Sequence, residues 1–211
     1  YLVMELIPEW RGTMRGQKAL RQVKNTLNPG AGTRHWANAW EQSPNAENAR
    51  HYAAALIEAN QHDEALTVLD KAMGGLFKHE PNLMLLKAQA EFAKEHFNEA
   101  NTTLSALVSE NPDFKSAEGH LLFARTLEQL SEIERSLEEY QAVSHYYPGA
   151  EARYRYCAAL QAASRHEQAR SEVERMLKDA KLAPAHFRKS QREWLKAAAK
   201  LAQELSQAST N

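Results

Sequence analysis

The stretch HDEALTVLDKAM, residues 62–73, is the part of the sequence from which the fold can be predicted. Three further segments repeat its pattern: FNEANTTLSALV at 97–108, IERSLEEYQAVS at 133–144 and HEQARSEVERML at 166–177. Each places mostly apolar residues at relative positions 0, 4 and 7, which form the stripe that an amphipathic helix buries. The stripes begin at Ala65, Ala100, Ser136 and Ala169, at separations of 35, 36 and 33 residues. A period of this length indicates an array of helical repeats.

The composition agrees with a nearly all-helical protein. The 211 residues include only 8 Gly and 7 Pro, and helix-forming residues are abundant. A hydrophobic content of 43% is enough for a core and too low for a membrane domain. Lys and Arg number 26 and Asp and Glu 27, so the formal net charge is -1. No global charge therefore favours nucleic acid or anionic lipid as a partner.

A second helix is expected before each stripe, because a small residue stands 12 positions ahead of each starting residue. These small residues are Ala53, Ala88, Ala124 and Cys157. Small residues at paired positions let two helix axes approach closely. Cys157 occupies a position that holds Ala in the other repeats, and no His lies near it in the pattern of an activated thiol. We therefore predict that Cys157 is a buried small hydrophobic residue and not a nucleophile.

These residues together resemble the tetratricopeptide repeat. The resemblance rests on the small pair 12 residues apart, the larger residue four positions after the second small residue, and the prolines that bound repeats. Pro81 opens the second repeat, and Pro112 and Pro148 close the second and third. The first-helix Trp of the family is missing, and its places hold Ala49, Met84, His120 and Arg153. The resemblance implies an all-α, right-handed solenoid of helix–turn–helix repeats at 46–80, 81–114, 115–149 and 150–181.

Two flanking segments are expected to cover the ends of the array at 46–181. Residues 28–45 should hold a hinge, in the breaker cluster LNPGAGT at 27–33, and a short capping helix from Arg34 to Glu41 with Trp36 and Trp40 on one face. Residues 182–211 should form one long capping helix after Pro184, followed by a tail.

The N-terminal segment, residues 1–27, leaves two interpretations open. It begins with the apolar stretch YLVMELIPEW, and basic residues without acidic ones follow at Arg11, Arg15, Lys18, Arg21 and Lys24. This order is typical of the cytoplasmic end of a membrane anchor. The alternative is an amphipathic helix with a solvated basic face. More weakly, the chain is similar to membrane-anchored tetratricopeptide proteins of Gram-negative bacteria, which implies cytoplasmic repeats, anchored or not to the inner membrane.

The sequence offers no motif for catalysis, for a cofactor or for a metal. HExxH, CxxC, the phosphate-binding glycine motifs and GxSxG are all absent. Three of the nine histidines, His62, His96 and His166, are expected in the turns between paired helices and therefore lie in different repeats. We predict a protein that is not an enzyme, with no catalytic, cofactor-binding or metal-binding residues.

The family resemblance implies that the first helices line a concave groove for a peptide or partner segment. Carried over by position, the groove candidates are Arg50, Ile57, Leu85, Gln89, Phe92, Leu121, Arg125, Glu128, Tyr154 and Gln161. Arg50 and Arg125 would bind an acidic residue of an otherwise apolar peptide. The alternative for the leucines is packing between repeats.

Two other functions stay open at this point. The chain could bind RNA or anionic lipid through its basic ends, Arg11 to Lys24 and Arg188 to Lys200. It could also oligomerise through an apolar patch around Trp36 and Trp40.

Overall fold

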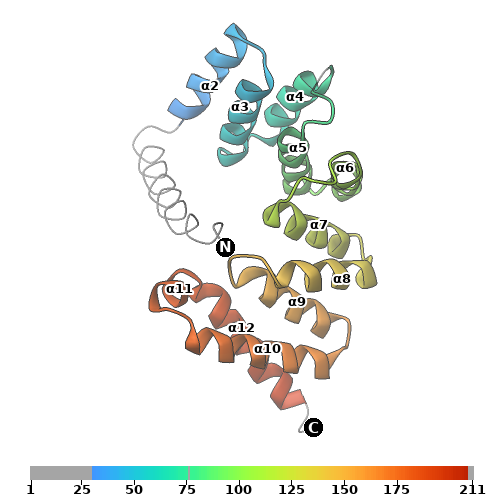
Figure 1. The fold of residues 1–211 in the computed structure, drawn as a ribbon, viewed down its shortest axis with the longest axis vertical. Coiled ribbons are helices and arrows are strands. Elements are labelled where there is room, and N and C mark those ends of the chain that lie inside the picture. The colour runs from blue at the N-terminus through green and yellow to red at the C-terminus, as the bar shows by residue number, and fades with distance from the viewer. Residues whose placement is uncertain (1–29, 76, 209–211) are drawn as a thin grey trace, which may run out of the picture. The chain divides into compact units, whose positions relative to one another are not determined.

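The computed structural model describes residues 30–75 and 77–208. Within these ranges the chain consists of eleven α-helices and no strand (Figure 1). The all-α class that the sequence predicts is confirmed. The helices in order are α2 (Ala31–Gln42), α3 (Ala46–Glu58), α4 (His62–Met73), α5 (Pro81–Ala93), α6 (Phe97–Glu110), α7 (Ala117–Gln129), α8 (Ile133–Ser144), α9 (Glu151–Ala162), α10 (His166–Leu182), α11 (Ala185–Ser190) and α12 (Arg192–Ala208). The chain divides into two compact units within α5, after Ala90.

The turn between the two helices of each repeat is built in the same way four times. Asn60 and Gln61 show the pattern: the Asn60 N–H donates to the carbonyl of Ile57, and the Gln61 N–H donates to the carbonyl of Leu56. These two bonds define a Schellman motif, whose central residue takes a left-handed conformation. The four residues in that position are Asn60, Glu95, Ser131 and Ser164, with φ of 58°, 62°, 60° and 60°. A tight reversal without glycine therefore sets each helix pair.

In the first unit, α2 packs against α3 and its two tryptophans are used in packing. The Trp36 ring stacks on His51 with 4.1 Å between ring centroids, and Trp40 is buried in the core of the unit. The helix begins at Ala31, three residues earlier than predicted, because Gly30 takes φ 85° and caps its start. Gly32 and Thr33, which the sequence analysis placed in a hinge, lie in its first turn. The rest of that hinge, 27–29, lies outside the described residues.

The small residues predicted to hold the paired helices together are buried throughout. Ala53, Ala65, Ala88, Ala100, Ala124, Ser136, Cys157 and Ala169 are all 0–1% exposed. Burial raises the pKa of the Cys157 thiol to about 12, so the thiol is protonated and unreactive at neutral pH. The prediction that Cys157 is a buried packing residue is confirmed.

The C-terminal segment forms two helices, α11 and α12, and the prediction of one long helix is wrong. The break lies at Gln191, whose side-chain Oε1 accepts a hydrogen bond of 2.9 Å from the N–H of Ala150 at the start of α9. After the break, α12 packs against α10 and α9. It buries Ala198, Leu201 and Leu205, which are 0%, 4% and 1% exposed. Its apolar stripe therefore completes the core of the second unit.

Candidate functional site

The groove candidates of the first unit lie on α3 and α5 and are partly buried: Arg50, Ile57, Leu85 and Gln89. Ile57 packs against the core of the unit. Arg50 contacts its neighbour His51, with 3.0 Å between the guanidinium Nη2 and the imidazole Nε2. Among the described residues, no carboxylate forms an ion pair with Arg50.

In the second unit, one candidate turns out to be a packing residue and the others remain accessible. Leu121 is 3% exposed and belongs to the core, so the alternative of packing between repeats holds for it. Phe92, Arg125, Glu128, Tyr154 and Gln161 are partly buried. The Glu128 carboxylate accepts a hydrogen bond of 2.6 Å from the Tyr140 hydroxyl. The Tyr154 ring lies against Trp194 of α12, with 5.6 Å between centroids.

Arg125 is the most distinctive of these side chains. Its guanidinium lies over the Phe92 ring, 4.6 Å from the centroid. Burial and the nearby Arg155 lower the pKa of Arg125, although a guanidinium keeps its charge at any physiological pH. Among the residues that the structure describes, no side chain forms a hydrogen bond or an ion pair with it. The five N–H donors of this half-buried cation are therefore available to water or to an anionic ligand.

Arg155 and Trp194 extend this surface and were not found from the sequence. The guanidinium of Arg155 lies 5.2 Å from the centroid of the Trp194 ring and forms an ion pair of 2.8 Å with Glu151. Arg155 stands 14 positions before Ala169, one position beside the residues that the family resemblance assigns to the groove. Trp194 comes from α12, outside the repeats. No signal within one repeat could have brought these two side chains together.

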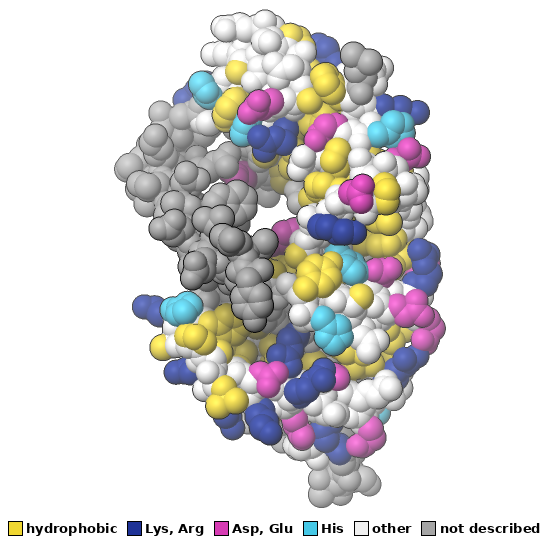
Figure 2. Space-filling model, viewed as in Figure 1, with side chains coloured by type: hydrophobic (Ala, Val, Ile, Leu, Met, Phe, Trp, Pro, Cys, Tyr) yellow, Lys and Arg dark blue, Asp and Glu magenta, His cyan; other side chains and the backbone are white. Residues whose placement is uncertain are grey.

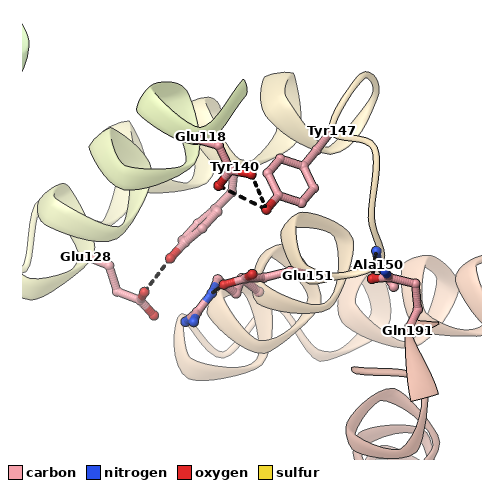
Figure 3. A network of polar contacts seen from close by, with 8 residues as sticks. Glu118, Glu128, Tyr140, Tyr147, Ala150, Glu151 and Gln191 are labelled. Atoms are coloured by element: carbon pink, nitrogen blue, oxygen red, sulfur yellow. Dashed lines mark hydrogen bonds and ion pairs between the residues drawn. The ribbon is translucent and has the colours of Figure 1, made fainter. Parts of the chain in front are cut away.

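Two tyrosines brace the same unit by donating to carboxylates. Figure 3 shows the Tyr140 hydroxyl pointing at Glu128 and the Tyr147 hydroxyl pointing at Glu118, which it meets at 3.2 Å. Burial raises the pKa of both tyrosines, and the neighbouring carboxylates add to the effect. Both hydroxyls therefore keep their protons and act as donors. The two bonds hold α7 against α8 and against the segment that leads into α9.

A pocket of about 710 Å³ lies elsewhere in the second unit, beside α6, α7 and the end of α8. Apolar side chains form most of its lining, among them Leu104, Leu107, Val108, Phe114 and Phe123, and its polar residues include His120, Glu139 and Tyr146. From the sequence, His120 stands out only as the residue at the position of the family's tryptophan. The pocket itself was not predicted, because Glu139 and Tyr146 follow His120 by 19 and 26 positions in the sequence.

His120 is held between two partners in this pocket. Its Nε2 lies 2.5 Å from Glu139 Oε2, and its Nδ1 contacts the Tyr146 hydroxyl. Burial and Glu139 raise the pKa of Tyr146, so the hydroxyl keeps its proton. A carboxylate oxygen accepts hydrogen bonds, so the contact with Glu139 places a proton on Nε2, and the Tyr146 hydroxyl meets the other ring nitrogen. The arrangement fixes the ring and does not generate a nucleophilic tyrosinate.

The basic residues near the C-terminus are partly used within the chain. Arg188 donates to the carbonyl of Ala183 at 2.5 Å, Lys196 lies 4.0 Å from Glu193, and Lys200 lies 3.5 Å from Glu204. On the face drawn in Figure 2, Lys and Arg side chains are interspersed with Asp and Glu. On this face, the described Lys and Arg side chains therefore form no extended positive surface for a phosphate backbone.

Several functional predictions fall outside the described residues or find no site within them. The apolar and basic N-terminal segment, 1–27, lies outside them, so the membrane anchor stays a prediction. No described helix from residue 30 onward is long and apolar enough to cross a membrane. Over the same residues, no three His, Cys, Asp or Glu side chains are grouped so that they could hold a metal ion.

Comparison with known proteins gives structural likeness only. No family model matches the chain, and no curated protein matches its sequence. The solved structure of TTC0263, a thermophilic TPR protein of Thermus thermophilus, has a TM-score of 0.63 and 16% identity over 87% of this chain and 98% of its own. YrrB, described as a TPR protein with an unusual peptide-binding site, has a TM-score of 0.61 and 17% identity over 83% and 97%. A double mutant of MamA RS-1 has a TM-score of 0.63 and 17% identity over 76% and 92%.

Proposed function

We propose that this chain, which has the tetratricopeptide-repeat fold, is a non-catalytic scaffold that binds a peptide or partner segment along its first helices. The fold alone does not name a ligand. The proposal therefore depends on the side chains of α5, α7 and α9 in the second unit. A structure of the same fold, YrrB, is described as having a peptide-binding site, which supports a peptide as the class of ligand.

The observation that carries the proposal is the state of Arg125. A half-buried guanidinium has lost part of its hydration, and this one is not compensated by a carboxylate within ion-pair distance among the described residues. A carboxylate of a ligand would supply paired, charge-assisted hydrogen bonds. The Phe92 ring already fixes one face of the guanidinium, so little side-chain freedom is left to lose on binding.

Apolar contacts would come from the aromatic side chains on the same unit. Phe92, Tyr154 and Trp194 are all partly exposed, and partly exposed aromatic side chains are common anchors in protein interfaces. Glu128 stands three residues from Arg125 and is held by Tyr140. The Glu128 carboxylate would repel a ligand with several acidic residues, so the site favours a ligand with a single acidic residue. The ligand that fits is an apolar segment with one acidic residue.

The absence of a poised nucleophile among these described side chains favours a scaffold over an enzyme. The Cys157 thiol is buried and protonated, and the hydroxyls of Tyr140, Tyr146 and Tyr147 have raised pKa values. None of these groups is activated for covalent chemistry at neutral pH.

An affinity capture from the source cell tests the proposal with two charge reversals on neighbouring helices. Arg125→Glu should remove the captured partner. Arg135→Glu is the matched control, because Arg135 is exposed on α8 and pairs with Glu132, one turn away. An unchanged partner with Arg125→Glu would contradict the proposal. Loss of the partner with both variants would also contradict it, since the effect would then not depend on this surface.

A further inference from the structure

We infer that the pocket beside α6, α7 and α8 is a second binding site, separate from the Arg125 surface, which accepts an apolar side chain next to a basic group of a partner protein. Its volume of about 710 Å³ lies within the range of ligand sites and is large enough for two or three side chains. The inference does not depend on the function proposed for the first helices.

The rim of the pocket exposes apolar surface to solvent. Across the described residues, five large hydrophobic side chains are exposed, and two of them, Val108 and Tyr146, line this pocket. Val108 is 61% exposed and Tyr146 is 55% exposed. Exposed apolar groups around a concave apolar surface are typical of protein-binding sites. The occupant therefore has an apolar body.

The polar part of the pocket selects a positive charge. Glu139 Oε2 accepts from His120, while Glu139 Oε1 has no hydrogen-bond partner in the described part of the chain. This second carboxylate oxygen is therefore available to a cationic donor of an occupant. The other charged lining residue, Lys115, is exposed and donates to the Pro112 carbonyl at 3.1 Å. Because Glu139 is the less hydrated of the two, its charge acts more strongly on an occupant.

The other repeats carry different residues at the position of His120, which lines this pocket. At the position of His120, the first two repeats carry Ala49 and Met84, which are 0% and 4% exposed and fill the core. The fourth repeat carries Arg153, which forms an ion pair of 3.0 Å with Asp179. In the third repeat His120 instead lines the pocket and contacts Glu139 and Tyr146. The polar part of the pocket lining therefore depends on residues that are specific to the third repeat.

Three small probes with the same apolar body test the inference on the full chain. We would titrate 4-phenylbutylamine, 4-phenylbutanol and 4-phenylbutyrate and follow backbone amide resonances by NMR. The amine should bind most tightly and should shift the resonances of Val108, Phe123 and Glu139. Glu139→Gln should weaken the amine about fivefold, as expected for a partly exposed ion pair, and leave the alcohol unchanged.

Two matched variants keep the outcome unambiguous. Glu138→Gln removes the same charge from the neighbouring exposed residue and should have no effect. Val108→Asp changes an exposed side chain, so the protein should stay folded, and it should weaken the alcohol. The inference is overturned if the butyrate binds as tightly as the amine, if the shifts lie outside the pocket, or if Glu138→Gln acts like Glu139→Gln. Arg125→Glu should leave amine binding unchanged, which separates this site from the first-helix surface.

Discussion

At the scale of single residues, the four left-handed turn residues each lower the stability of the folded chain, because none of them is glycine. A non-glycine residue with positive φ is disfavoured by contact between its Cβ and the backbone, by roughly 1–2 kcal/mol. Ser131 is exposed and has φ 60°. We expect Ser131→Gly to be more stable than Ser131→Ala by about 1 kcal/mol. Urea denaturation of the two variants measures the difference. Greater stability of the alanine variant would show that helix propensity outweighs the left-handed conformation.

Cys157 provides a second prediction at this scale. Its pKa is about 12 in the folded chain and near 9 when unfolded, so the folded state holds the proton more tightly. The resulting stability is complete below pH 9 and is lost as the pH rises from 9 toward 12. Between about pH 9 and pH 10 the wild type should lose about 1 kcal/mol more than Cys157→Ala. Denaturation curves at about pH 9 and pH 10 check this, and parallel losses in the two proteins would refute it.

At the scale of elements, the helices that could be predicted from the sequence are those that belong to the four repeats. The apolar stripe and the small residue 12 positions before it each occur four times in the chain, so an irregular residue in one copy does not obscure the pattern. The break at Gln191 could not be predicted, because it depends on a contact with Ala150, 41 residues away. The residues of the candidate site also fall into a predictable and an unpredictable group. Arg125 follows from its position in a repeat, whereas the contact of Arg155 with Trp194 joins a repeat to α12.

The contact between Gln191 and Ala150 yields a prediction about how α12 is placed. Gly149 leaves room for the Gln191 side chain, because a Cβ atom at position 149 would stand 2.9 Å from Gln191 Oε1. Gln191→Leu removes the acceptor for the Ala150 N–H and should cost about 1 kcal/mol. Gln191→Glu keeps an acceptor oxygen and should retain most of the stability. Amide hydrogen exchange at Ala150 reads the bond directly. Equal protection in the leucine and glutamate variants would mean that the side chain has no capping role.

At the scale of the whole molecule, a repeat array differs from a globular domain because each helix pair is stabilised mainly by its sequence neighbours. The core of the first unit is built from α2 to α5, and that of the second from α7 to α12. A loss of packing at one end should therefore be felt most strongly by the adjacent helices, and should fade along the chain.

Paired core truncations at the two ends of the array test this gradient. Leu201→Ala in α12 and Leu69→Ala in α4 each remove a buried side chain, 4% and 0% exposed, and should each cost about 3 kcal/mol. We expect Leu201→Ala to raise amide exchange most in α9 and α10 and to leave α3 unchanged, because local opening propagates through neighbouring interfaces. Leu69→Ala should raise amide exchange most in α3 and leave α9 and α10 unchanged. If both variants raised exchange uniformly, the chain would unfold as one cooperative unit. A ligand bound at the Arg125 surface or in the His120 pocket would then protect α3 from amide exchange as strongly as it protects the nearby helices.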